Sequence, residues 1–445
     1  MRELFRNSKI DLRVALTVMT ALALSACTTV PLEPYPPQRP GPGPVVTTPP
    51  PVQPIPQDQL PEEPIDEQIV EVPEDAEPFF NNREGLTLPH MAGRDAKRLA
   101  LLLPFSAQSE GLRRQANSMF RAAELALFQR PEGDILLTVL DTKGTQDGAQ
   151  SAARAAVQQG ADVILGPIIA GNVASASIEA APSGTPLLAF SNDQSVADRG
   201  RYLLSFPPEA EVERIVNYAA SQGITNFAFF GPDDAYGRRV LRAYEQAVLF
   251  TGGQITASES YRGDDISVMQ EPARRLARFF QRGRDGERDT FEAVLMPEAG
   301  TALRSLAPLL PFYGVDPERV LFMGTSRWDD KTIAREPALR GGVFAASDKQ
   351  AREAFLNEYD RAYGEAPTSL ASLAYDAVQL GALVADGDPQ GRLERIESPV
   401  GFYGTDGYVR FTADGRPERG LAVYTVMDGD FDLVDPAPRG PTPDS

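Results

Sequence analysis

The chain has 445 residues, a formal charge of −19 at pH 7, one cysteine (Cys27) and one histidine (His90). The length allows two lobes of ordinary size, whereas the negative charge argues against nucleic-acid binding, which normally needs a basic face. One cysteine and one histidine at the end of a linker exclude an intramolecular disulfide, a Cys/His metal site and a histidine-dependent nucleophile. Chemistry that uses carboxylates alone remains open, because Asp and Glu are plentiful. No pair of them stands out by spacing, so we assign no metal, no cofactor and no catalytic residues.

Residues 1–26 have the features of a secretory signal peptide. An apolar stretch from Val14 to Leu24, too short for a comfortable membrane span, follows a basic start. The ending Leu24-Ser25-Ala26-Cys27 resembles the bacterial lipobox, and this resemblance implies that Cys27 is lipid-modified. Thr28 in place of aspartate resembles the pattern sorted to the outer membrane, the inner membrane being the alternative. A plain signal peptide with a chance cysteine remains the other interpretation.

Residues 27–94 are interpreted as a Pro-rich, acidic, disordered tether. Proline dominates from Pro31 to Pro78, and no Lys or Arg occurs between Arg39 and Arg83. Such a composition favours extended conformations over a packed core. About fifty residues could reach on the order of 150 Å. The tether is either a plain spacer or a Pro-rich ligand for another protein.

Alternating apolar strands and helical segments follow from about residue 95. The run Val163-Ile164-Leu165 stops at Gly166-Pro167, a small-residue helical segment follows, and a second apolar run, from Pro186 to Phe190, ends at Ser191-Asn192-Asp193. This pattern predicts a parallel βαβ unit whose strand ends share one rim. Together with the strands and helices on either side, it predicts an open α/β sheet with helices on both faces.

A second series of strands and helices begins after Pro207-Pro208, so we predict two doubly wound lobes of mainly parallel sheet. Gly341 to Ala345 is interpreted as the return crossing to the first lobe. The expected boundaries are 95–207 and 341–400 for lobe 1, 208–340 and 401–435 for lobe 2, and 436–445 for a tail.

Four ordered segments resemble the type I periplasmic binding fold of leucine/isoleucine/valine-binding proteins. They are Ile164-Leu165-Gly166-Pro167, the Pro186–Ser191 strand end, Asp233-Asp234-Ala235-Tyr236-Gly237, and the pair Tyr375-Asp376-Ala377-Val378 with Phe411-Thr412-Ala413-Asp414-Gly415. The resemblance covers about residues 97 to 435. It implies two lobes that close on a ligand held in a cleft between them.

Carried over by position, the resemblance places six candidate residues at the cleft: Gly166, Ile168, Ser191, Asn192, Tyr236 and Trp328. Two departures argue against a free amino acid. The loop from Ile168 to Asn172 has no hydroxyl for a ligand carboxylate, and Asn192-Asp193 replaces the usual Ala-Thr pair.

Each candidate also has a purely structural interpretation. Tyr236 could pack on its own helix, Ser191 could end a strand, and Trp328 could be a structural tryptophan. Asp233 and Asp234 are better suited to capping the following helix than to binding a ligand.

The lipobox, the tether and this fold together resemble the outer-membrane lipoproteins that activate penicillin-binding proteins, although the N-terminal helical repeats of the best-known members have no counterpart here. The resemblance implies a non-enzymatic regulator of peptidoglycan synthesis that contacts a penicillin-binding protein and faces the periplasm from its lipid anchor. The alternative is a solute-binding component of an ABC-type uptake system, with an amino acid or related small molecule in the cleft. An enzyme that uses cleft carboxylates is a third possibility.

Overall fold

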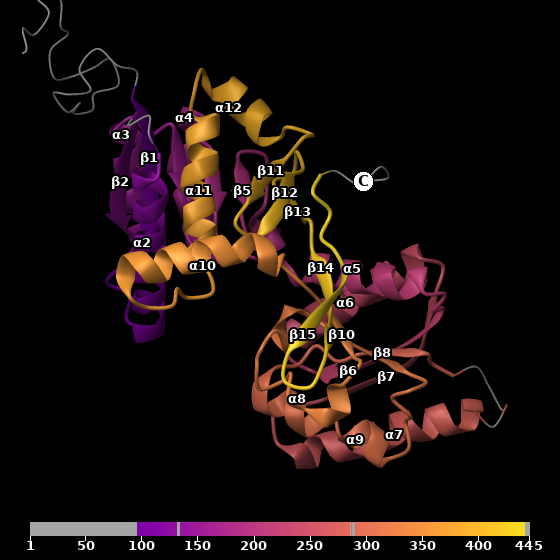
Figure 1. Ribbon diagram of the computed structural model, residues 1–445. Coiled ribbons are helices and arrows are strands. Elements are labelled where there is room, and N and C mark those ends of the chain that lie inside the picture. The colour runs from indigo at the N-terminus through magenta and orange to yellow at the C-terminus, as the bar shows by residue number, and fades with distance from the viewer. Residues whose placement is uncertain (1–95, 131–133, 285, 287–289, 441–445) are drawn as a thin grey trace, which may run out of the picture. The chain divides into compact units, whose positions relative to one another are not determined.

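The computed structural model describes residues 96–130, 134–284, 286 and 290–440. The signal peptide, Cys27 and the tether lie outside the described residues. The described part contains two α/β lobes, and Figure 1 labels most of their strands and helices. No helix in this part is long and apolar enough to cross a membrane.

The first lobe is built on a five-stranded parallel sheet with strand order β2-β1-β3-β4-β5. Leu99, Leu101 and Leu103 of β1 point to one face, and Ala100 and Leu102 point to the other. Both faces are apolar because helices cover both. The strands are β1 Lys97–Leu103, β2 Ile135–Asp141, β3 Val163–Leu165, β4 Leu187–Ala189 and β5 Arg201–Leu203.

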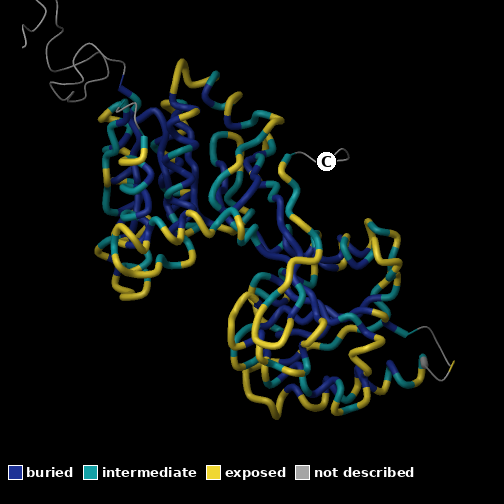
Figure 2. Tube along the Cα trace, in the orientation of Figure 1, coloured by how far each residue is buried: buried dark blue, intermediate teal, exposed yellow. Residues whose placement is uncertain are grey.

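Helices of the first lobe pack by their small apolar residues. One face of the sheet packs against α2 and α11, and the other packs against α3 and α4. Figure 2 shows these helices buried toward the sheet and exposed on the outside. The helices are α2 Glu110–Phe128, α3 Gln146–Gln158, α4 Ala170–Ser183, α10 Lys349–Tyr363, α11 Ala371–Val384 and α12 Pro389–Ile396, with a short 3₁₀ turn at Gln194–Val196.

The second lobe repeats this topology. Its parallel strands follow the order β7-β6-β8-β9-β10, and two antiparallel strands, β14 and β15, extend the sheet beyond β10. The prediction of two doubly wound lobes is confirmed. The strands are β6 Asn226–Pro232, β7 Gln254–Tyr261, β8 Ala293–Leu295, β9 Leu321–Gly324, β10 Val343–Ala346, β14 Ala422–Val426 and β15 Phe431–Asp435.

Helices α5 and α6 cover one face of the second sheet, and α7, α8 and α9 cover the other. Helix α6 begins at Ala235, where the Asp234 carboxylate accepts a hydrogen bond from the backbone N–H of Gly237 at 2.7 Å. The helices are α5 Pro208–Ser221, α6 Ala235–Phe250, α7 Ile266–Arg284, α8 Gly300–Leu306 and α9 Leu309–Phe312, with 3₁₀ turns at Ser326–Trp328 and Pro337–Leu339.

The chain crosses between the lobes later than the sequence suggested. Val343–Ala346 is a strand of the second sheet and not a crossing, so the return to the first lobe follows residue 346. Strands β11 Phe402–Gly404, β12 Gly407–Phe411 and β13 Pro417–Arg419 form a separate three-stranded sheet. Val409 and Phe411 of this sheet are part of the first lobe's core, so the last crossing falls near residue 420 instead of 401.

Candidate functional site

The rim of the first lobe begins at Gly166, directly after β3. Gly166 has a φ of +100° and precedes a cis proline, Pro167. A Cβ atom at this position would lie 2.5 Å from the carbonyl oxygen of Leu102, so only glycine fits. Ile168 is partly buried and packs against the core of the lobe. Helix α4 then begins at Ala170 without a side-chain cap from Ile169.

Ser191 and Asn192 follow β4 at the same edge of the sheet. Ser191 is buried, and its hydroxyl accepts a hydrogen bond from the backbone N–H of Asp193 at 3.2 Å. This contact is the strand-ending role that the sequence allowed as an alternative. Asn192 is exposed, and its backbone carbonyl accepts a hydrogen bond from Arg239 at 2.6 Å. The Asn192 side chain is therefore available to a ligand, whereas the Ser191 hydroxyl already has a partner.

Ser106 and Asp141 form a polar pair at this edge that sequence reasoning did not identify. Ser106 follows β1 and Asp141 is the last residue of the neighbouring β2, and the Ser106 hydroxyl donates to the Asp141 carboxylate at 2.5 Å. Burial opposes ionisation of Asp141, but hydrogen bonds from Ser106 and from the Lys143 backbone hold its pKa below the usual value. In the sequence, Ser106 and Asp141 each stand at the end of an apolar run, and this position could have identified them as rim residues.

Tyr236 lies at the rim of the second lobe, in the first turn of α6. Its hydroxyl lies 3.1 Å from that of Thr325, which follows β9. The guanidinium of Arg327 lies over the Tyr236 ring, 4.4 Å from its centroid. Burial raises the pKa of Tyr236 to about 12, so the phenol stays neutral at physiological pH. The aromatic ring thus supports a cation at the strand ends.

Two buried carboxylates lie beside this cation. Glu211 of α5 accepts hydrogen bonds from the Ser326 backbone N–H at 2.9 Å and from the Ser326 hydroxyl at 2.7 Å. Burial raises the pKa of Glu211 to about 7, although the Ser326 hydrogen bonds act against the shift. Glu298, after β8, accepts a hydrogen bond from Tyr261 at 3.0 Å and lies 4.0 Å from Arg327. Sequence reasoning missed both glutamates, because neither lies in the segments that carried the resemblance.

Trp328 is buried in the core of the second lobe. Its indole N–H donates to the Met296 carbonyl at 3.0 Å, and its ring packs against Gly324, where a Cβ atom would lie only 2.2 Å from it. This position matches the structural alternative for Trp328. The tryptophan fixes the turn that carries Ser326 and Arg327, and we do not include it among the proposed ligand contacts.

A second buried charged cluster lies where the chain crosses between the lobes. Asp406, with a fully buried side chain, pairs with Arg352 at 2.7 Å. Asp376 accepts a hydrogen bond from the Thr405 backbone at 2.8 Å, and burial together with the nearby Asp406 raises its pKa. Arg419 donates to the Ser205 carbonyl at 2.9 Å, while its terminal nitrogens, like Asp376 Oδ2, have no direct hydrogen bond to the described residues. We name this group the crossing cluster.

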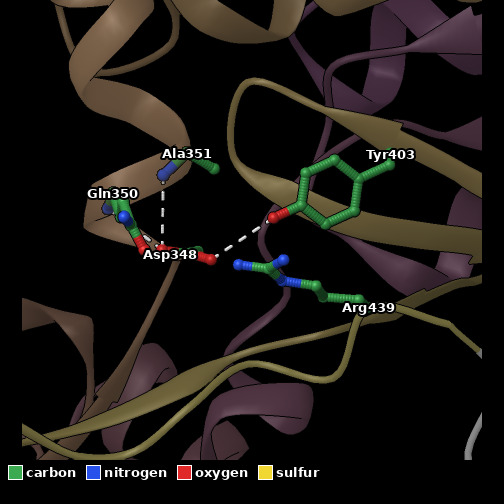
Figure 3. Close-up of a pocket in the computed structure, with 5 residues that line it drawn as sticks. All are labelled: Asp348, Gln350, Ala351, Tyr403 and Arg439. Atoms are coloured by element: carbon green, nitrogen blue, oxygen red, sulfur yellow. Dashed lines mark hydrogen bonds between the residues drawn. The ribbon is translucent and has the colours of Figure 1, made fainter.

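Three cavities lie elsewhere on the first lobe. Their volumes are about 440, 430 and 350 Å³. Figure 3 shows the first of these, where Tyr403 and Arg439 point toward Asp348 at the start of α10. Asp348 caps this helix through Gln350 and Ala351, and its other oxygen lies 3.4 Å from the Tyr403 hydroxyl. Within the described residues, no three acidic, histidine or cysteine side chains are grouped to hold a metal ion.

Comparisons with known proteins agree with this architecture. No curated protein sequence matches the chain. A putative branched-chain amino acid ABC transporter from Rhodospirillum rubrum is 20% identical, with a TM-score of 0.65, over 76% of this chain and 100% of that one. A substrate-binding protein from Desulfitobacterium hafniense in complex with Leu is 19% identical, with a TM-score of 0.53, over 76% and 100%.

A benzoate complex of a solute-binding protein from R. palustris is 17% identical, with a TM-score of 0.52, over 78% of this chain and 97% of that one. At such identities these structures establish the fold alone. The family model for periplasmic binding proteins matches residues 98–430, which is most of the chain. The chain therefore belongs to the periplasmic binding protein family.

Proposed function

We propose that this protein acts by binding and not by catalysis, and that it holds a small solute at the rims of its two lobes as a component of an ABC-type uptake system. The observation that carries the proposal is Arg327, a cation held over Tyr236 and beside Glu298 at the strand ends of the second lobe. Ligands of open α/β sheets bind outside the carboxyl ends of the strands.

The chemistry of the second rim favours a solute that carries a carboxylate. The Arg327 side chain is 39% exposed, so its guanidinium can accept a ligand anion without leaving the Tyr236 ring. Glu298 lies 4.0 Å from this cation and suits an amino group on the same ligand. Similar folds with bound leucine and benzoate support a ligand of this class, namely an amino acid or a related acid.

The first rim contributes backbone groups and the exposed Asn192 side chain. Side-chain hydroxyls are missing from Ile168 to Asn172, so donors at the start of α4 would come from the main chain. Gly166 and Ile168 shape this wall of the proposed site, and Ser191 holds its second loop.

A thermal-shift titration of the full chain against amino acids and small aromatic and aliphatic acids tests this proposal. A ligand at one hundred times its Kd stabilises the folded state by about 2.7 kcal/mol. Arg327→Ala should weaken binding by about tenfold to a hundredfold, because a charge-assisted hydrogen bond is lost. The matched control is Arg340→Ala, which changes an exposed arginine that pairs with Asp428. Absence of a shift with every compound would contradict solute binding.

A second function is supported by the N-terminal sequence and by the lack of side-chain hydroxyls from Ile168 to Asn172. In this proposal the protein is anchored to the outer membrane through a lipid on Cys27, and the tether of residues 27–94 lets the head reach a penicillin-binding protein and regulate peptidoglycan synthesis. A transport component bound to a nearby permease has little need of such reach.

Crosslinking in intact cells separates the two functions. The regulator predicts a crosslinked penicillin-binding protein that disappears when Cys27→Ser releases the chain from the membrane. A transport component predicts crosslinks to a permease. Recovery of the wild-type chain outside the outer-membrane fraction would contradict the proposed anchoring.

A further inference from the structure

Arg239 joins the two rims by a direct hydrogen bond. It lies on α6 of the second lobe, and its Nη2 donates to the Asn192 carbonyl of the first lobe at 2.6 Å. Asn192 follows β4, so neither residue belongs to the segments that connect the lobes. A rotation of one lobe against the other therefore changes the distance between Asn192 and Arg239, and the bond between them restrains that rotation.

Glu209 holds the Arg239 guanidinium in a fixed orientation. This carboxylate lies in the first turn of α5 and accepts hydrogen bonds from Arg239 Nε at 2.5 Å and from Nη2 at 2.7 Å. Nη2 carries two N–H groups, so it can serve Glu209 and the Asn192 carbonyl together. The Arg239 and Glu209 side chains are 23% and 29% exposed, so water and salt screen this pair less than a fully exposed one.

Asp193 adds a charge to the first-rim side of this contact. Hydrogen bonds from Ser195 lower the pKa of the Asp193 carboxyl group, and the positive charge of Arg239 contributes to the lowering. The carboxylate is therefore ionised at physiological pH and attracts Arg239. The Asn192-Asp193 pair, which replaces the usual Ala-Thr, thus supplies both an acceptor and a charge for Arg239.

The first turn of α5 also supports Arg327, the cation proposed to bind the solute. Glu211 lies in this turn with Glu209, and it accepts the two hydrogen bonds from Ser326, which directly precedes Arg327. One turn of helix therefore anchors Arg239 through Glu209 and the loop of Arg327 through Glu211. A continuous series of hydrogen bonds and helix backbone links the first rim to the ligand cation of the second.

We propose that Arg239 is a positioning residue of the solute site, which holds Asn192 at a set distance from Arg327 without touching the solute. The inference rests on the proposed solute binding, in which these two residues contact one ligand. A solute then enters a site whose width is already set, and less freedom is lost on binding. Without Arg239, only a fraction of the molecules hold both contacts at the distance that the solute needs, and the apparent affinity falls by that fraction.

Double electron–electron resonance on the full chain measures the spacing of the lobes. Spin labels are attached at Ala174→Cys on α4 and at Gln246→Cys on α6, two exposed positions in different lobes, after Cys27→Ser removes the native cysteine. With no solute added, Arg239→Ala should broaden the distance distribution. Glu209→Gln should broaden it less, because a neutral amide still holds the guanidinium, but more weakly.

Arg238→Ala is the matched control on the same helix. Arg238 directly precedes Arg239, and its ion pair with Asp233, at 2.7 Å, stays within the second lobe. Its removal should leave the distance distribution of the wild type. Asn192→Ala should also leave it unchanged, because Arg239 bonds to the main-chain carbonyl at this position. Urea denaturation of each variant verifies its fold.

The affinity for a solute found by thermal shift is the second measurement. Arg239→Ala should weaken it by about tenfold, the scale of one charge-assisted hydrogen bond, and Arg238→Ala by less than about twofold. A loss of affinity with an unchanged distance distribution would place Arg239 in direct contact with the solute and overturn the positioning role. A broader distribution with unchanged affinity would overturn it too, because the spacing would then not matter to binding.

Failure of this inference is distinguishable from failure of the solute site. Absence of a thermal shift with every compound contradicts the solute site, whereas the distance distribution is measured without any solute. Identical distributions in the wild type, Arg239→Ala and Glu209→Gln would overturn the positioning role of Arg239 even where a solute binds.

Discussion

The second rim and the crossing cluster both contain a buried carboxylate with a raised pKa, but the hydrogen-bond partners of the two carboxylates differ. Glu211 receives two hydrogen bonds from Ser326, directly before an exposed arginine. Asp376 has one oxygen bonded to the Thr405 backbone and the other against Gly404, where a Cβ atom would lie 2.2 Å away. The rim network includes an exposed arginine, whereas Asp376 and Asp406 of the crossing cluster are almost fully buried.

This difference separates a binding network from a structural one. At the rim, Arg327 can exchange contacts with a ligand while Glu211 and Tyr236 keep their partners. In the crossing cluster, Arg352 follows the second crossing, Arg419 precedes the third, and the Ser205 carbonyl belongs to the first. The cluster therefore ties together the three segments that connect the lobes, and Asp406 supplies the counter-charge for its two arginines.

The largest effect is expected from Asp406→Ala. Removal of this buried carboxylate leaves Arg352 and Arg419 without their main counter-charge, which should lower the free energy of unfolding by about 3–5 kcal/mol. Urea denaturation measures the change. The control Asp428→Ala removes an exposed partner of Arg340 and should cost no more than about 1 kcal/mol. Equal losses of unfolding free energy in the two variants would contradict a structural role for the crossing cluster.

A pH-dependent effect is expected from Glu211→Gln. The pKa of Glu211 rises from 4.5 to about 7 on folding, so its contribution to stability is complete below pH 4.5 and is lost as the pH rises through 7. Glutamine keeps an acceptor for Ser326 and cannot ionise. Between pH 4.5 and 8 the wild type should lose about 3 kcal/mol relative to the variant.

Urea denaturation at several pH values measures this difference, and subtracting the two curves removes the contributions of the other acids. Glu245→Gln, at an exposed position on α6, should keep the wild-type dependence. Parallel curves for wild type and Glu211→Gln would place the Glu211 carboxylate in a more solvated site than the structure gives it.

The repeated fold was predictable because buried parallel strands appear as short apolar runs ended by Gly or Pro. Val163–Leu165 before Gly166 is one example, and Asn226–Pro232 before Asp233-Asp234 is another. Sheet membership was less predictable. The sequence of Val343–Ala346 is compatible both with a crossing between the lobes and with an added strand. Its pairing with the neighbouring β9, which the sequence does not show, makes it a strand.

The candidate site was predictable only where a residue lies at a strand end within a recognisable segment, as Tyr236 does. Glu211 and Ser326 are 115 residues apart, and no local pattern reports that they meet. Arg327 directly precedes the predicted candidate Trp328 in sequence, but its position over Tyr236 depends on the burial of that tryptophan. Which residue of this loop is exposed depends on tertiary packing, and local sequence patterns do not report tertiary packing.

The smallest effect is expected from Tyr236→Phe, which distinguishes a rim residue that binds from one that only packs. Loss of the hydroxyl leaves the buried Thr325 hydroxyl without this partner and should lower the free energy of unfolding by about 1 kcal/mol. The ring remains under Arg327, so the cation stays in place. If Tyr236 only supports Arg327, the affinity for a solute found by thermal shift should change by less than about twofold, whereas direct contact between the phenol and the ligand should cost about tenfold. Calorimetric titration of the variant and of Arg327→Ala with the same solute decides between these roles, because only direct contact makes both variants lose affinity.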